Sequence, residues 1–167
     1  MKKLVTHFNE IVSSITFTMT VLVVTVNVFS RFLFGHSFSF TEEIAFIGFT
    51  YSVFLGAVIL FKTRAHVAID IVVDKLPEKL QGIVTLLTYL LLFVANVYFL
   101  YLSTYLSIEA WIRRTAALDI PYTFIDLAAA YAFLVMAYYS LKFIIVIIKN
   151  RGRVPDVDED HNATLNL

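Results

Sequence analysis

Four long runs of apolar residues constrain the fold more than any other feature of the sequence. They cover residues 11–34, 44–61, 82–108 and 122–148. A helix needs about 20 mostly apolar residues to cross the ~30 Å hydrocarbon core of a bilayer. Each run is apolar on all sides rather than along one stripe, which favours helices that lie in lipid. The sequence therefore predicts an all-α membrane protein with four transmembrane helices in one domain, residues 1–148.

The composition supports this prediction. Hydrophobic residues make up 59% of the chain and charged residues 16%, and a soluble domain of 167 residues could not hide so much apolar surface. The net charge of zero gives no reason to expect nucleic acid as a partner, and the absence of cysteine excludes disulfides and thiolate sites. The first run is longer than the apolar part of a signal peptide and has no small-x-small cleavage pattern, so we expect a retained span.

Lysine and arginine in the short connecting segments predict the orientation. They are concentrated at the N-terminus, in the segment 62–81 and after residue 148, whereas the opposite side has only Arg31, Arg113 and Arg114. The side richer in these residues is the cytoplasmic one, so both termini are predicted to be cytoplasmic. The tail 149–167 has too little apolar content to fold, and we expect it to be disordered.

The predicted outer corner between the first two spans contains a cluster of charges. Ser39 and Glu42 fit a capping box that would begin the second helix. Glu42 and Glu43 lie in its first turn, where the helix dipole favours anions, and Arg31 is close enough in sequence to pair with one of them. Two interpretations remain open. The cluster either caps the helix at headgroup level or docks a partner subunit.

Three small residues, Gly48, Ser52 and Gly56, are spaced four apart in the second span. This spacing places them on one helix face and allows another helix to approach closely. The pattern predicts a packing face, but it leaves open whether the partner helix belongs to this chain or to another.

The segment 62–76 has a polar stripe and a broad apolar face, which predicts an amphipathic helix in the cytoplasmic membrane interface. His66 and Asp70, four residues apart within it, can form an ion pair or part of a surface stripe. Two ligands without a third are weak evidence for a metal site. We therefore expect no metal and no cofactor.

Arg113 and Arg114 lie on the predicted outer side, against the charge bias. They can bind lipid headgroups or an acidic partner surface. Away from their ends, the first three spans contain no ionisable residue, whereas proton and ion pumps depend on such residues within the membrane. The sequence thus predicts that this chain alone is not a pump. We also expect no catalytic site and no enzyme.

Several motifs, taken in order, resemble the small membrane subunit of tripartite ATP-independent periplasmic (TRAP) transporters, the DctQ-like or SiaQ-like component. The resemblance covers about residues 10–148, and Asp119 stands where the family's turn has glycine. The motifs are Arg-Phe-Leu-Phe-Gly at 31–35, Ser-Phe-Thr-Glu-Glu at 39–43, Phe-Leu-Gly-Ala at 54–57, Arg-x-His and Asp at 64–70, Leu-Pro at 76–77 and Ala-Leu-Asp-Ile-Pro at 117–121.

This resemblance implies a scaffold subunit in the bacterial inner membrane. It would form a heterodimer with a larger multi-span subunit that carries the sodium and substrate sites. A soluble periplasmic protein would deliver the substrate, an organic acid of the sialic acid or C4-dicarboxylate type. The residues that we expect to contact partners are Arg31, Glu42, Glu43, Gly48, Ser52, Gly56, His66, Asp70, Arg113 and Arg114.

Three other functions compete with this one. A small four-span exporter would need a membrane-embedded carboxylate in its first span, which is absent from this sequence. A haem-binding bundle would need histidines within the spans, whereas the four histidines lie at ends, in loops or in the tail. A membrane assembly protein unrelated to transport remains an alternative.

Overall fold

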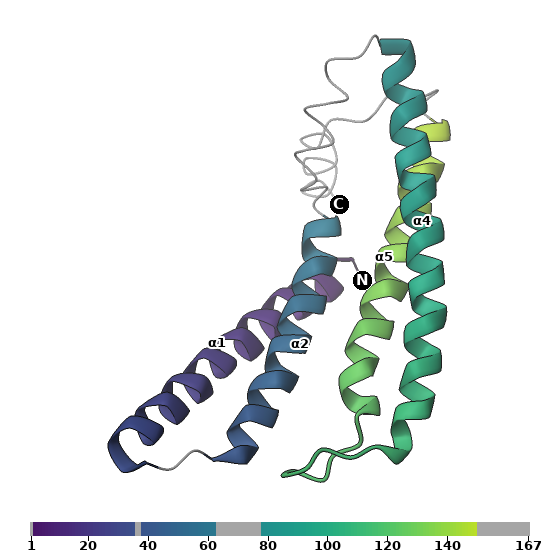
Figure 1. The fold of residues 1–167 in the computed structure, drawn as a ribbon. Helices are drawn as coiled ribbons and strands as arrows, with labels where there is room; N and C mark the ends of the chain where they lie inside the picture. Colours follow the sequence, from purple (N-terminus) through teal and green to yellow (C-terminus); the bar gives the residue numbers. More distant parts are fainter. Residues whose placement is uncertain (1, 36–37, 63–77, 150–167) are drawn as a thin grey trace. The chain divides into compact units, whose positions relative to one another are not determined.

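The computed structural model describes residues 2–35, 38–62 and 78–149, and these residues are largely helical. Both predicted cytoplasmic segments, 62–76 and 149–167, lie almost entirely outside this range. Figure 1 shows the order of the helices along the chain. They are α1 (Lys2–Phe34), α2 (Ser39–Lys62), α4 (Glu78–Glu109), a short 3₁₀ turn η1 (Ala110–Ile112) and α5 (Thr123–Lys149).

Four of these helices are long and apolar enough to cross a membrane, which confirms the prediction of four transmembrane helices. The spanning segments are Asn9–Phe34, Ser39–Lys62, Leu80–Ile112 and Thr123–Lys149. In lipid a helix satisfies its own backbone hydrogen bonds, so it can continue past the apolar run into the headgroup region. For this reason the helices extend beyond several of the predicted ends.

The corner between α1 and α2 is made by a glycine and an asparagine. Gly35 has a φ of +67°, and its N–H donates to the Arg31 carbonyl at 3.1 Å, which ends α1 with a left-handed residue. The N–H of Phe38, just before α2, donates to Oδ1 of Asn27 at 3.2 Å. No capping bond between Ser39 and Glu42 occurs among the described residues, because Ser39 is already part of the helix.

The chain divides into two compact units. The first comprises Met1–Ile59 and Phe99–Phe133. In it α1 lies against α2, and Phe133 of α5 stacks on Phe99 of α4 at 5.3 Å and contacts Phe54 of α2 edge-on at 5.9 Å. Aromatic side chains thus join three helices of this unit.

The second unit comprises Leu60–Tyr98 and Leu134–Leu167. Its described part consists mainly of the first half of α4 and the second half of α5. Tyr89 of α4 packs on Phe143 of α5, with ring centroids 5.2 Å apart. Ser140 is fully buried, and its hydroxyl donates to the Met136 carbonyl at 2.9 Å, which satisfies it within the helix.

Burial differs strongly between the helices. In the most apolar stretch of α5, 39% of the residues are buried, but in that of α1 only 6% are. The buried residues of α5 include Ala128, Ala132 and Ser140, the small residues that allow close helix approach. Among the four spanning helices α5 is therefore the most buried, and most residues in the apolar stretch of α1 are not buried.

Candidate functional site

The small-residue row of α2 packs against α1 of the same chain. A Cβ atom added to Gly48 would overlap Oγ1 of Thr20 and would lie 3.3 Å from the Thr16 carbonyl oxygen. A Cβ added to Gly56 would be 3.6 Å from Oγ of Ser13, an ordinary contact. The helix that packs on this face is therefore α1 of the same chain, which the spacing alone could not determine.

Hydroxyl groups fill the space that these glycines leave. Oγ of Ser13 donates to the Ser52 carbonyl at 3.1 Å, and the Thr16 and Ser52 hydroxyls share a hydrogen bond of 2.9 Å. Ser52 also donates to the carbonyl of Gly48, and Thr16 to the carbonyl of Val12. Because these hydroxyls bond to one another and to nearby carbonyls, the cluster joins the two helices.

Glu43 fastens α2 to the segment that precedes α5. Its two carboxylate oxygens accept hydrogen bonds from the backbone N–H groups of Ala117 at 2.7 Å and Leu118 at 2.9 Å. The pairing with Arg31 suggested by the sequence is not seen. Within the described ranges neither Glu42 nor Glu43 forms an ion pair with Arg31, and both Arg31 and Glu42 are exposed.

The segment held by Glu43 is a tight turn. Thr115 and Ile120 are joined by two hydrogen bonds, and Arg114 and Pro121 form an isolated bridge. Asp119 has a φ of +54°, the left-handed conformation that glycine adopts most easily and that aspartate also tolerates. Arg114 holds Asp119 there by an ion pair of 3.1 Å and a bond to its backbone carbonyl. Asp119 is thus held in a backbone conformation that glycine adopts with less strain.

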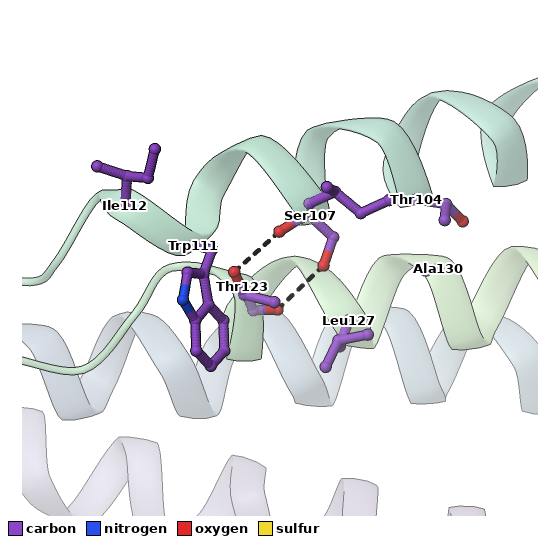
Figure 2. A pocket seen from close by; sticks show the side chains of 8 residues that line it. Thr104, Ser107, Trp111, Ile112, Thr123, Leu127 and Ala130 are labelled. Carbon is purple, nitrogen blue, oxygen red and sulfur yellow. Dashed lines mark hydrogen bonds between the residues drawn. The ribbon is translucent and has the colours of Figure 1, made fainter.

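A second pair of hydrogen bonds joins the end of α4 to the start of α5. The hydroxyl of Thr123 donates to the Ser107 carbonyl at 2.8 Å, and the hydroxyl of Ser107 donates to the Thr123 carbonyl at 3.4 Å (Figure 2). Beside them lies an open apolar groove of about 540 Å³. The residues that line it are Thr104, Ser107, Ile108, Trp111, Ile112, Thr123, Leu127 and Ala130.

Of the remaining residues that we expected to contact partners, the structure describes Arg113 but not His66 and Asp70. Arg113 is exposed in the segment between η1 and α5, close enough to Asp126 for their charges to interact. Among the residues that the structure describes, no group of three metal-ligating side chains occurs.

Sequence reasoning missed the polar contacts between distant parts of the chain. Tyr131 of α5 donates to Oδ1 of Asn9, a buried residue of α1, at 3.2 Å. Tyr51 of α2 donates to the carbonyl of Phe124 at 2.7 Å. An asparagine or tyrosine within an apolar run indicates that a partner is needed, but the sequence does not identify that partner.

Comparison with known proteins identifies the family. Residues 20–150 match the family described as "Tripartite ATP-independent periplasmic transporters, DctQ component", which is most of the chain. The chain belongs to this DctQ family. A DctQ protein is a component of a transporter and not an enzyme, which confirms both the resemblance seen in the motifs and the expectation that the chain catalyses no reaction.

Two proteins from Haemophilus influenzae (strain Rd) are similar in sequence to this chain. Both are named "Putative TRAP transporter small permease protein". One is 27% identical over 132 residues, which are 76% of this chain and 80% of the relative. The other is 36% identical over 101 residues, which are 60% of this chain and 57% of the relative. The chain is thus a multi-span membrane protein of the small permease type of TRAP transporter.

Proposed function

We propose that this DctQ protein is a scaffold subunit that holds a larger, multi-span transport subunit in the membrane and does not itself bind the transported solute. The observation that carries this proposal is the bonding of the hydroxyl groups between α1 and α2. Ser13, Thr16 and Ser52 bond to one another and to nearby carbonyls. Such groups fix helices to one another and leave little with which to bind a solute.

The distribution of charge supports the same role. Away from the helix ends, the first three spans have no ionisable residue in the sequence. Intramembrane carboxylates, lysines or histidines usually mark a path for ions or protons. We therefore place the sodium and substrate sites in the large subunit, with an organic acid of the sialic acid or C4-dicarboxylate type as the solute.

The proposed orientation places both termini in the cytoplasm and the chain in the bacterial inner membrane. Lysine and arginine are enriched at the start of α1 (Lys2 and Lys3), between α2 and α4 and after α5, and the positive-inside rule assigns these regions to the cytoplasm. The segment 62–76 would lie as an amphipathic helix on the cytoplasmic surface, and the tail 149–167 would be disordered. The turn held by Glu43 would then face the periplasm, where the binding protein delivers the solute.

Co-expression of this chain with its proposed large membrane subunit tests the proposal. Proteoliposomes that contain both subunits, given the periplasmic binding protein, should take up an organic acid when a sodium gradient is applied. Proteoliposomes that contain this chain alone should show no uptake above empty vesicles. Sodium-driven uptake by this chain alone would contradict the scaffold role.

A further inference from the structure

Helix α1 has two lines of side chains on opposite sides. We call the first line the inner seam, because every residue of it is buried or half-buried. Its members recur at alternating steps of four and three residues, the spacing that keeps side chains facing a neighbouring helix. The inner seam consists of Asn9, Ser13, Thr16, Thr20, Val23, Asn27 and Ser30.

The second line, the outer seam, has the same alternation but starts two residues later. At about 100° per residue, this offset places it on the opposite side of the helix. Every member is exposed: Ile15 and Leu22 each expose 60% of their surface, and Phe32 exposes 85%. The outer seam consists of Ile11, Ile15, Thr18, Leu22, Thr25, Phe29 and Phe32.

Two threonines make this seam unlike a surface that only meets lipid. Thr18 and Thr25 are exposed within the span, and the structure gives their hydroxyls no hydrogen bond within the described residues. By contrast, Thr16 and Thr20 of the inner seam both donate to backbone carbonyls. Lipid tails offer no hydrogen-bonding group, whereas threonine hydroxyls and their small size both favour contact with another transmembrane helix.

The surface next to Thr18 is also hollowed. A shallow groove of about 360 Å³ lies there, between larger side chains. Small side chains set among large ones form the kind of hole into which a side chain of an adjacent helix fits. The residues that line the groove are Ser14, Ile15, Thr18, Met19 and Leu22.

The outer seam continues into an apolar corner at the end of the span. Leu33 and Phe34 are 73% and 75% exposed, and Phe32 precedes them. The charged residues Arg31 and Glu42 are exposed on either side of this corner, which places it at the level of the lipid headgroups. Lipid tails cover such a corner poorly, so a protein surface suits it better.

We propose that the outer seam of α1 is the surface on which a transmembrane helix of the large transport subunit packs, with its end covering the corner. This inference rests on the proposed function, because a component of a tripartite transporter needs a surface for its membrane partner. The inner seam is already occupied by α2 and α5 of this chain through Ser13, Thr16 and Asn9. The outer seam is exposed along its whole length, and it combines a helix-packing repeat with two threonines whose hydroxyls make no hydrogen bond among the described residues.

Site-specific photo-crosslinking in the purified complex tests this assignment. The photoreactive residue p-benzoyl-phenylalanine would replace Thr18 or Thr25 of the outer seam, one position per variant. The comparison variants would carry it at Leu87 or Leu91, which are exposed on α4 to a similar degree as the outer seam. After illumination, the yield of crosslinks to the large subunit should be at least about tenfold higher for the α1 variants than for the α4 variants. This ratio is expected if α1, and not α4, contacts the large subunit.

The outcomes separate the two proposals. Crosslinks to the large subunit from α4 but not from α1, or crosslinks from α1 to a second copy of this chain or to lipid alone, would overturn the outer-seam assignment while leaving the scaffold role intact. If this chain retains no large subunit before illumination, the proposed function itself fails.

A substitution provides an independent measurement. Thr25→Trp places a bulky side chain on the outer seam without touching the inner seam, so the chain should fold but recover about tenfold less large subunit. Leu91→Trp is the matched control and should leave recovery unchanged. Equal recovery with both variants, together with unchanged thermal unfolding, would overturn the assignment.

Discussion

Glu43 Oε1 lies 2.7 Å from the backbone nitrogen of Ala117, although 74 residues separate the two in sequence. The other carboxylate oxygen accepts from Leu118. One side chain in the first turn of α2 thus determines the position of the turn that leads into α5. This contact ties the start of α2 to the segment before α5.

Replacing Glu43 should loosen this turn. In Glu43→Gln one of the two acceptor oxygens becomes an amide that cannot accept, so the turn should lose one hydrogen bond and the negative charge that strengthens the other. We expect a lower midpoint of thermal unfolding in detergent and faster hydrogen exchange at Ala117 and Leu118. The exposed neighbour Glu42 is the control, and Glu42→Gln should change neither quantity. Equal exchange in both variants would show that the contact does not hold the turn.

The two glycines of α2 should respond differently to the same substitution. Gly48→Ala forces a Cβ into Thr20, and this overlap should cost about 1–3 kcal/mol of folding stability. The higher helix propensity of alanine offsets at most ~1 kcal/mol of that cost, so the variant should be less stable. Gly56→Ala meets only an ordinary contact and should be neutral or stabilising. Adding Thr20→Ala to Gly48→Ala should restore part of the loss. Equal unfolding midpoints for the two alanine variants would disprove the close approach of α1 at Gly48.

Asp119 should tolerate only residues that accept a left-handed backbone. Asp119→Gly removes the ion pair with Arg114 but also removes the backbone strain of a positive φ, so stability should change little. Asp119→Asn keeps a side chain that tolerates a positive φ, so its stability should also change little. Asp119→Val should cost about 1–2 kcal/mol, because its Cβ opposes a positive φ. Unfolding in a denaturant series would measure the differences. A valine variant as stable as the glycine variant would mean that the turn adopts another conformation.

The bond between Tyr131 and Asn9 should contribute to the packing of α1. Tyr131→Phe leaves the buried oxygen of Asn9 without its donor and should cost about 1–3 kcal/mol. Tyr138→Phe, at an exposed tyrosine for which the structure shows no hydrogen bond, is the control and should be nearly neutral. A double-mutant cycle with Asn9→Ala gives the coupling between the two residues directly. Additive effects in that cycle would exclude the bond.

The sequence predicted the helices better than the contacts between them. Hydropathy depends on composition over about 20 residues, so four spans could be recognised without a structure. The ends of the helices were predicted less well. Helix α1 begins at Lys2 and α2 at Ser39, because polar residues continue each helix outside its apolar run. The interfacial helix predicted at 62–76 and the cytoplasmic termini stay predictions.

Individual residues show why the candidate site could be predicted only in part. The spacing of Gly48, Ser52 and Gly56 indicated a packing face, but only the fold places α1 on it. Arg31 was the nearest opposite charge to Glu43 in sequence, yet backbone N–H groups of a distant turn bind that carboxylate. Local patterns specify what a side chain can bind, whereas its partner depends on the arrangement of the whole unit.

The composition of the complex that this chain forms in its native membrane tests the central claim most directly. The tagged chain would be purified in mild detergent from its native cells, and the mass and subunit ratio of the purified complex would be measured by native mass spectrometry. The account predicts a complex of one copy of this chain with one copy of a much larger multi-span membrane protein. A stable assembly that contains only copies of this chain would contradict the account.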